Sequence, residues 1–130
     1  MNDNIRAGLM TVGRVLLVLI FLISGGRKAM DVAGTASTIA SKGLPYPDIV
    51  AALTILLEIG GALLVIFNRF AAPAALALAA FSVAAGVLFH NFWAFEDPAQ
   101  YRNQFNHFMK NIAIAGAFLT IAAAPTTNKW

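Results

Sequence analysis

Four long apolar stretches divide the chain, and each is long enough to cross a lipid bilayer as a helix. They cover roughly residues 7–26, 49–67, 70–89 and 107–124. A hydrocarbon core about 30 Å thick needs about 20 helical residues, so all four stretches meet the length requirement. The pattern predicts an all-α, multi-pass membrane protein that forms a single domain over residues 1–130.

The connections between the stretches predict how the helices are arranged. Only Asn68 and Arg69 separate the second stretch from the third, so these two helices must be antiparallel neighbours. In the long first connection, Asp31 can cap a short helix that lies in the membrane interface. Asp97 as an N-cap before Pro98 indicates that the last helix begins before its apolar part. We therefore expect a four-helix up-down bundle with a short interfacial helix in the first loop.

The first apolar stretch has an alternative interpretation as a secretory signal peptide. Arg6 precedes the apolar residues 15–23, which are followed by small residues. Arg14 does not fit that pattern, and three further spans follow it. We therefore expect an uncleaved first helix.

The amino-acid composition excludes several classes of protein and of functional site. Of the 130 residues, 59% are hydrophobic, 12% are charged and none is cysteine. A soluble domain of this size could not bury so much apolar surface. Without cysteine, the chain alone cannot form disulfides, iron-sulfur clusters or thiolate zinc sites. The net charge of +3 is spread thinly, so no nucleic-acid partner is expected.

Glu58 is the most unusual residue, because it lies near the middle of the second apolar stretch. A carboxylate at that depth costs about 2–3 kcal/mol or more unless it is paired, protonated or hydrated. Helix rise places Glu58 about 16 Å below Pro47, and Arg14 about 18 Å below Gly26, from the same membrane face. We therefore expect an Arg14–Glu58 pair. The alternative is that Arg14 extends to the interface while Glu58 stays protonated.

A second group of polar residues gathers on the side of the long loops. His90 ends the third span, and His107, Lys110 and Asn111 share one face at the start of the fourth. If that face points inward, a polar cavity opens from this side and reaches down toward Glu58. Either histidine could instead be an ordinary interfacial side chain.

The preferred function for such a cavity is the binding of a quinone or similar amphiphile under a cationic rim, with proton movement by a carboxylate and a histidine. Glu58, His90 and His107 are the candidate catalytic residues. The candidate ligand-binding residues are Arg14, Arg27, Lys28, Lys110 and Asn111.

Other functions stay open. Haem or another metal on the two histidines is less favoured, because their spacing matches no ligand signature, and we predict no metal site. The chain could also be a non-catalytic accessory or scaffold subunit, which a buried ion pair would help to pack, or a small-molecule or lipid transporter. Oligomers are possible in each case.

Several short runs of residues follow one another along the chain in a fixed order. The runs are Gly13-Arg14, Phe21-Leu22-Ile23-Ser24-Gly25, Lys28, Gly43-Leu44-Pro45, Leu57-Glu58-Ile59-Gly60-Gly61, Phe89-His90-Asn91-Phe92-Trp93, His107-Phe108 and Lys110-Asn111. Together they cover nearly the whole chain, which resembles the DoxX family of small bacterial membrane proteins.

The resemblance implies a four-helix protein of the bacterial inner membrane, in a group named after a subunit of a thiosulfate:quinone oxidoreductase system. It favours a role in membrane redox chemistry. Because the chain has no cofactor-binding motif of its own, any oxidoreductase activity is expected to need partner subunits.

Overall fold

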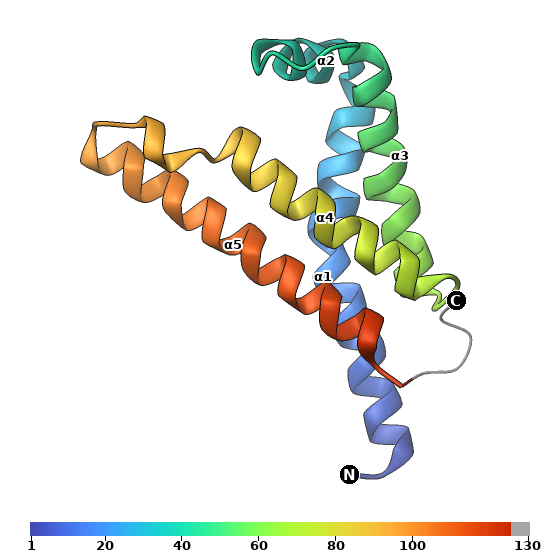
Figure 1. Ribbon diagram of the computed structural model, residues 1–130. Coiled ribbons are helices and arrows are strands. Elements are labelled where there is room, and N and C mark those ends of the chain that lie inside the picture. Colours follow the sequence, from blue (N-terminus) through green and yellow to red (C-terminus); the bar gives the residue numbers. More distant parts are fainter. Residues whose placement is uncertain (126–130) are drawn as a thin grey trace.

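The computed structural model describes residues 1–125, and within this range the chain is helical and contains no strand. The elements in chain order are α1 (Asp3–Met30), α2 (Val32–Ser41), α3 (Pro47–Ile66), α4 (Ala71–Phe89), the 3-10 turn η1 (Phe92–Ala94) and α5 (Pro98–Ala123). The long helices α1, α3, α4 and α5 alternate in direction, and α2 lies across the ends of α1 and α3 (Figure 1).

Local side-chain chemistry explains where several helices begin. The Asp31 carboxylate accepts a hydrogen bond from Gly34 N at 2.9 Å and caps α2. The Asp97 carboxylate caps α5 in the same way. Pro47 takes the first position of α3, where its missing N–H leaves no bond unmade. The predicted short helix in the first connection and the early start of the last helix are both confirmed.

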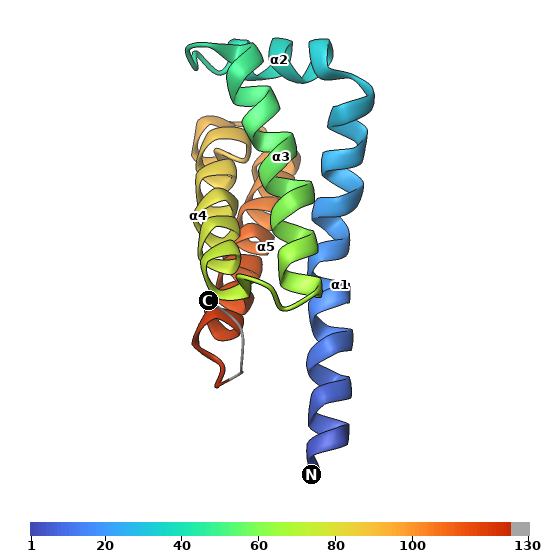
Figure 2. The same ribbon diagram turned by 90° about the vertical axis from the view of Figure 1, so that its right-hand side faces the viewer.

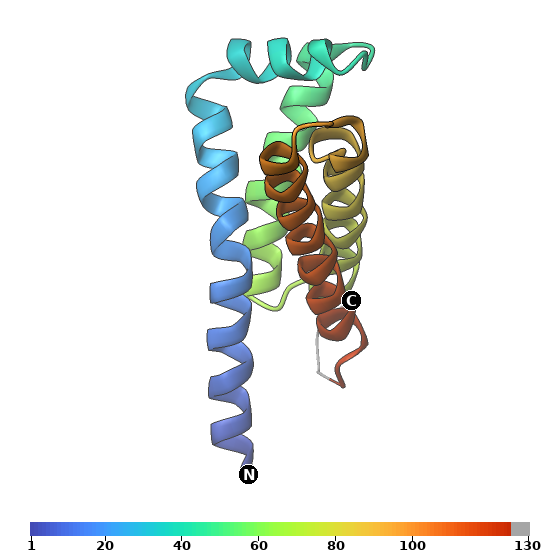
Figure 3. The same cartoon turned by 90° about the vertical axis from the view of Figure 1, so that its left-hand side faces the viewer.

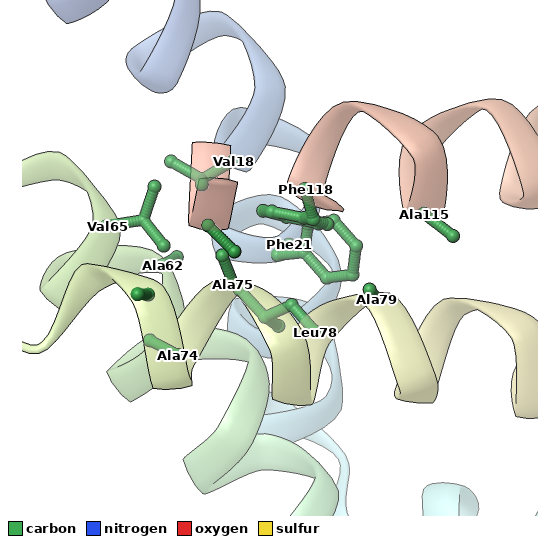
Figure 4. Close-up of a cluster of buried hydrophobic side chains, with 12 residues drawn as sticks. Val18, Phe21, Ala62, Val65, Ala74, Ala75, Leu78, Ala79, Ala115 and Phe118 are labelled. Carbon is green, nitrogen blue, oxygen red and sulfur yellow. The ribbon is translucent and has the colours of Figure 1, made fainter. Parts of the chain in front are cut away.

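One hydrophobic core joins all four long helices, and Figure 4 shows how its side chains converge. Phe118 of α5 is fully buried, and its ring centre lies 5.5 Å from that of Phe21 on α1. Small side chains on α4 let its neighbours approach closely, which favours helix association in lipid. The buried members of this core are Val18, Phe21, Ala62, Val65, Ala72, Ala74, Ala75, Leu78, Ala79, Ala115, Phe118 and Ala122.

Beyond this core, toward α2, the α4–α5 hairpin leans away from α1 and α3 (Figure 1). A second, smaller cluster joins α2 to α3 through Ala36, Ile39 and Ala51, and Phe89 of α4 packs against it. The two clusters therefore hold the helices together at different levels. In Figures 2 and 3, the side of α1 that faces away from α3 is not covered by another helix.

The outer surface of the helices fits a lipid environment. Within residues 1–125, the segments Asp3–Met30, Pro47–Ile66 and Ala71–Ala94 are long and apolar enough to cross a membrane. Leu16 is 65% exposed and Leu56 is 68% exposed. Apolar side chains that face outward along membrane-length helices contact lipid rather than water. The chain is therefore an integral membrane protein.

The predicted four-helix up-down bundle is not confirmed as a whole. The span predicted at residues 107–124 lies in α5, which is not among the three membrane-length apolar segments of residues 1–125. Polar residues such as Asn106, Lys110 and Asn111 lower the hydropathy of its first half. The all-helical fold is confirmed.

The contact between α1 and α3 provides a test with a matched control. A Cβ at Gly25 would lie 2.7 Å from Ile59 Cγ1 and 3.1 Å from Glu58 Cβ, whereas one at Gly26 would meet nothing within 4 Å. We expect Gly25→Ala to lower the free energy of unfolding by about 1–3 kcal/mol, because the added methyl forces the helices apart. Gly26→Ala should change it by less than about 1 kcal/mol.

Unfolding of both variants would be followed by circular dichroism in mild detergent. Equal destabilisation of the two would contradict the close approach of α1 to α3 at Gly25.

Candidate functional site

Glu58 lies in a closed network of three polar side chains between α1 and α3. Its side chain is 3% exposed, and its Oε2 lies 2.7 Å from Lys28 Nζ. Ser24 Oγ donates to Glu58 Oε1 at 3.0 Å, and Lys28 Nζ donates to Ser24 Oγ at 3.1 Å. Both carboxylate oxygens therefore accept a hydrogen bond, which compensates for the burial of the charge.

The helices bring these groups together for simple geometric reasons. Ser24 and Lys28 are four residues apart on α1, so they project from the same face. Gly25 has no side chain, which lets the α3 backbone approach at the level of Glu58. The Lys28 ammonium also lies 5.8 Å from the centre of the Phe81 ring on α4, within the range of a cation–π contact.

The predicted Arg14–Glu58 pair is wrong. The part of α1 that contacts Glu58 is at Gly25, and Arg14 lies about 16 Å along the helix from that residue at 1.5 Å per residue. Arg14 is buried, but its Nε has no hydrogen-bond partner among the residues that the structure describes. The sequence-based estimate failed because α1 continues to Met30, so Lys28 is part of the helix and reaches the carboxylate.

A cavity of about 850 Å³ lies against this network. It is bounded by α1, α2, α3, α4 and α5, in the region where the α4–α5 hairpin leans away (Figure 1). Five of the predicted site residues line it: Arg27, Lys28, Glu58, His90 and Asn111. A cavity is therefore present on the side of the long loops and it reaches Glu58, but most of its lining is apolar rather than polar as predicted.

The other three predicted site residues are not part of the cavity lining. Arg14 is buried on α1, and Lys110 is exposed on α5. His107 packs against His90, with ring centres 4.9 Å apart and planes 21° from parallel. The two histidines are therefore in contact, although only His90 lines the cavity.

Hydrogen bonding orients the His90 ring. Its Nδ1 lies 2.9 Å from Gln104 Oε1, and because an amide oxygen can only accept, Nδ1 is the donor, which in a neutral ring leaves Nε2 as the acceptor. No group of three or more His, Cys, Asp or Glu side chains in residues 1–125 is arranged to hold a metal ion.

The charges around the cavity cancel. Arg27 and Lys28 face it together with Asp31 and Glu58, so its charged lining sums to zero with neutral histidine. The predicted cationic rim is therefore reduced to Arg27, since Lys28 is paired and Lys110 lies elsewhere.

Sequence reasoning missed two side chains of this site. Ser24 contacts Glu58 directly, and its four-residue spacing from Lys28 was a signal that could have identified it. Phe81 lines the cavity beside Lys28, but one phenylalanine in an apolar helix gives no comparable signal.

Comparisons with known proteins identify relatives of this chain. The family model described as DoxX matches residues 9–91, which is more than half of the chain. The chain belongs to the DoxX family. The part of this DoxX protein that matches includes Lys28, Glu58 and His90 and ends before His107 and Asn111.

Two relatives of this DoxX protein come from Escherichia coli strain K12. Inner membrane protein YphA is 35% identical over 117 residues, which cover 90% of this chain and 83% of YphA. Inner membrane protein YqjF is 34% identical over 111 residues, which cover 85% of this chain and 79% of YqjF. No solved structure matches the chain. These relatives and the three apolar helices confirm the predicted location in a bacterial inner membrane.

A double-mutant cycle tests which basic residue of this DoxX protein is paired with Glu58. Lys28→Met should destabilise the protein by about 3 kcal/mol, because it leaves a buried carboxylate without its cation. Combining it with Glu58→Gln should restore part of that loss, giving a coupling energy of about 1–3 kcal/mol.

The matched control is Arg14→Met, whose effect should add to that of Glu58→Gln within about 0.5 kcal/mol. Unfolding by sodium dodecyl sulfate in mixed micelles gives the free energies. The assignment fails if Arg14, rather than Lys28, couples to Glu58.

Proposed function

We propose that this DoxX protein is a membrane component of a quinone-linked redox system and binds a quinone or a similar neutral amphiphile in the cavity beside Glu58. The observation that carries the proposal is the Ser24–Lys28–Glu58 network, which holds a buried carboxylate between two helices and forms part of the cavity wall. Ionisable side chains in membrane helices commonly mark ligand or proton pathways.

The lining supports a neutral head group that carries oxygen atoms. Its charges cancel, so neither an anion nor a cation is favoured overall. The Lys28 ammonium and the Ser24 hydroxyl are donors that a carbonyl oxygen could share. Phe21, Phe81 and Phe89 add aromatic surface for a flat ring. The volume of about 850 Å³ lies within the usual range for small-molecule sites.

A quinone takes up protons together with electrons when it is reduced to the quinol. We assign the proton exchange to Glu58, whose carboxylate faces the cavity and is held by Lys28 and Ser24. His90 presents Nε2 as a second proton acceptor, and His107 packs against its ring and fixes its position. Asn111 lines the same cavity from α5 and could orient the head group.

Arg27 remains the ligand-binding candidate on the rim, while Arg14 and Lys110 receive no part in binding because neither lines the cavity. The chain carries no recognisable motif for a redox cofactor, so the proposed electron transfer needs partner subunits. That part of the proposal rests on the resemblance to the DoxX family and not on the cavity.

The proposal includes a fourth membrane span at residues 107–124 and a single domain with up-down topology. Support comes from Phe118 and Ala122 of α5, which are buried in the same core as Val18 and Val65. The second half of α5 therefore lies at the depth of two membrane-length helices. The polar first half would then reach the headgroup region, where Tyr101 and similar aromatic side chains are favoured.

The proposal predicts that Glu58→Gln weakens binding of decylubiquinone at least about tenfold, which is about 1.4 kcal/mol. The neutral amide keeps the shape of the carboxylate but cannot hold the Lys28 ammonium by charge. Lys110→Gln serves as the control, because Lys110 is exposed and outside the cavity, and it should leave the affinity unchanged. Calorimetric titration of protein in lipid nanodiscs gives the dissociation constants.

A second variant shows whether weaker binding is caused by loss of the fold. Lys28→Met with Glu58→Gln removes both charges and should be more stable than Lys28→Met alone, while still binding decylubiquinone weakly. Unchanged affinity in both variants would reject the proposed site and favour an accessory subunit, whose buried pair serves packing alone.

A further inference from the structure

A second, open groove, of about 530 Å³, runs along the surface of α1. All the residues that line it come from this helix, at spacings of three and one, so they form a single stripe. They are Leu16, Leu19, Ile20, Ile23, Ser24, Arg27 and Lys28. The stripe is apolar over Leu16 to Ile23 and polar from Ser24 onward.

The two cavities share one boundary. Ile20, Ser24, Arg27 and Lys28 line both of them, so the outer groove meets the inner cavity at the Ser24–Lys28 edge of the Glu58 network. The apolar part of the groove is open to the outside, since Leu19 is 46% exposed and Ile23 is 48% exposed. Leu16 at the far end of the groove is 65% exposed, so lipid can reach this region. Figure 2 shows α1 at the edge of the helix assembly.

We infer that the ligand is an amphiphile with a long apolar tail, and that it enters sideways from the bilayer along α1. The head group passes Ser24 and Lys28 into the inner cavity, while the tail stays on the stripe from Leu16 to Ile23. This stripe extends about 12 Å along the helix below Ser24 at 1.5 Å per residue. A water-soluble substrate would need no such groove, so the structure favours a lipid-borne ligand class such as an isoprenoid quinone.

This inference rests on the proposed function, and its test uses two probes that separate the head from the tail. The probes are decylubiquinone and the same benzoquinone ring without a tail. In lipid nanodiscs, Leu19→Trp with Ile23→Trp fills the outer groove without touching the lining of the inner cavity. We expect this variant to weaken decylubiquinone binding at least about tenfold and to leave the tail-free ring within about twofold.

Leu56→Trp is the control, because Leu56 is exposed on α3 and lines neither cavity. It should leave the affinity for both probes unchanged. If the groove variant binds decylubiquinone as tightly as the parent protein does, the route along α1 is rejected while the proposed function stands. If the parent protein binds neither probe, both are rejected.

Photolabelling provides a readout that does not depend on affinity. A quinone with a diazirine at the end of its tail should label the α1 peptide that contains residues 16–23, and excess decylubiquinone should suppress that labelling. Suppressible labelling confined to other helices would overturn the inference.

Discussion

The structure depends on one constraint: a carboxylate inside an apolar helix needs a cation or a hydrogen-bond donor next to it. Glu58 meets this constraint by contacting Lys28 and Ser24 of the neighbouring helix. The contact fixes the register between α1 and α3, since a shift of one helical turn would move the ammonium about 5.4 Å away. It also requires a residue without a side chain at Gly25. Packing, register and burial of the charge are therefore parts of one arrangement.

The cavity follows from how the core is distributed. Large and small side chains interlock around Phe118 at one end of the long helices, and α2 joins α3 at the other. Between these two levels, the α4–α5 hairpin leans away from α1 and α3 (Figure 1). The cavity that the Glu58 network lines is bounded by residues of α1, α2, α3, α4 and α5. A buried ion pair contributes little net stability compared with apolar packing. Its position on a cavity wall is the feature on which the proposed ligand site is built.

Much of the fold could be predicted from the sequence, because hydropathy and capping are local signals. The apolar stretches predicted the positions of the long helices. Asp31 and Asp97, as N-cap residues, predicted correctly where two helices begin. Alternating helix directions also predicted that His90 and His107 would lie on the same side, and their rings are in contact. The partner of Glu58 could not be obtained in this way. The first apolar stretch ends near Gly26, but α1 continues to Met30, so hydropathy alone does not mark the end of this helix.

The remaining errors have a related physical cause. Contacts between helices depend on how each helix is rotated about its axis and tilted against its neighbours. The order of apolar and polar residues along the chain does not contain this information. Lys110 is predicted to share an inward face with Asn111, yet only Asn111 lines the cavity. The stripe from Leu16 to Ile23 is apolar like any lipid-facing surface, so its groove was not recognisable before the neighbouring polar residues were placed.

The most direct test of the Glu58 network is a solid-state NMR distance measurement in lipid bilayers. With nitrogen-15 at lysine Nζ and carbon-13 at glutamate Cδ, a contact between Nζ and Oε2 of 2.7 Å predicts strong dipolar coupling for Lys28 and Glu58. The coupling should vanish in Lys28→Met and persist in Arg14→Met. Absence of this coupling in the parent protein, with the carboxyl coupled instead to an arginine side chain, would contradict the network on which the proposed site is built.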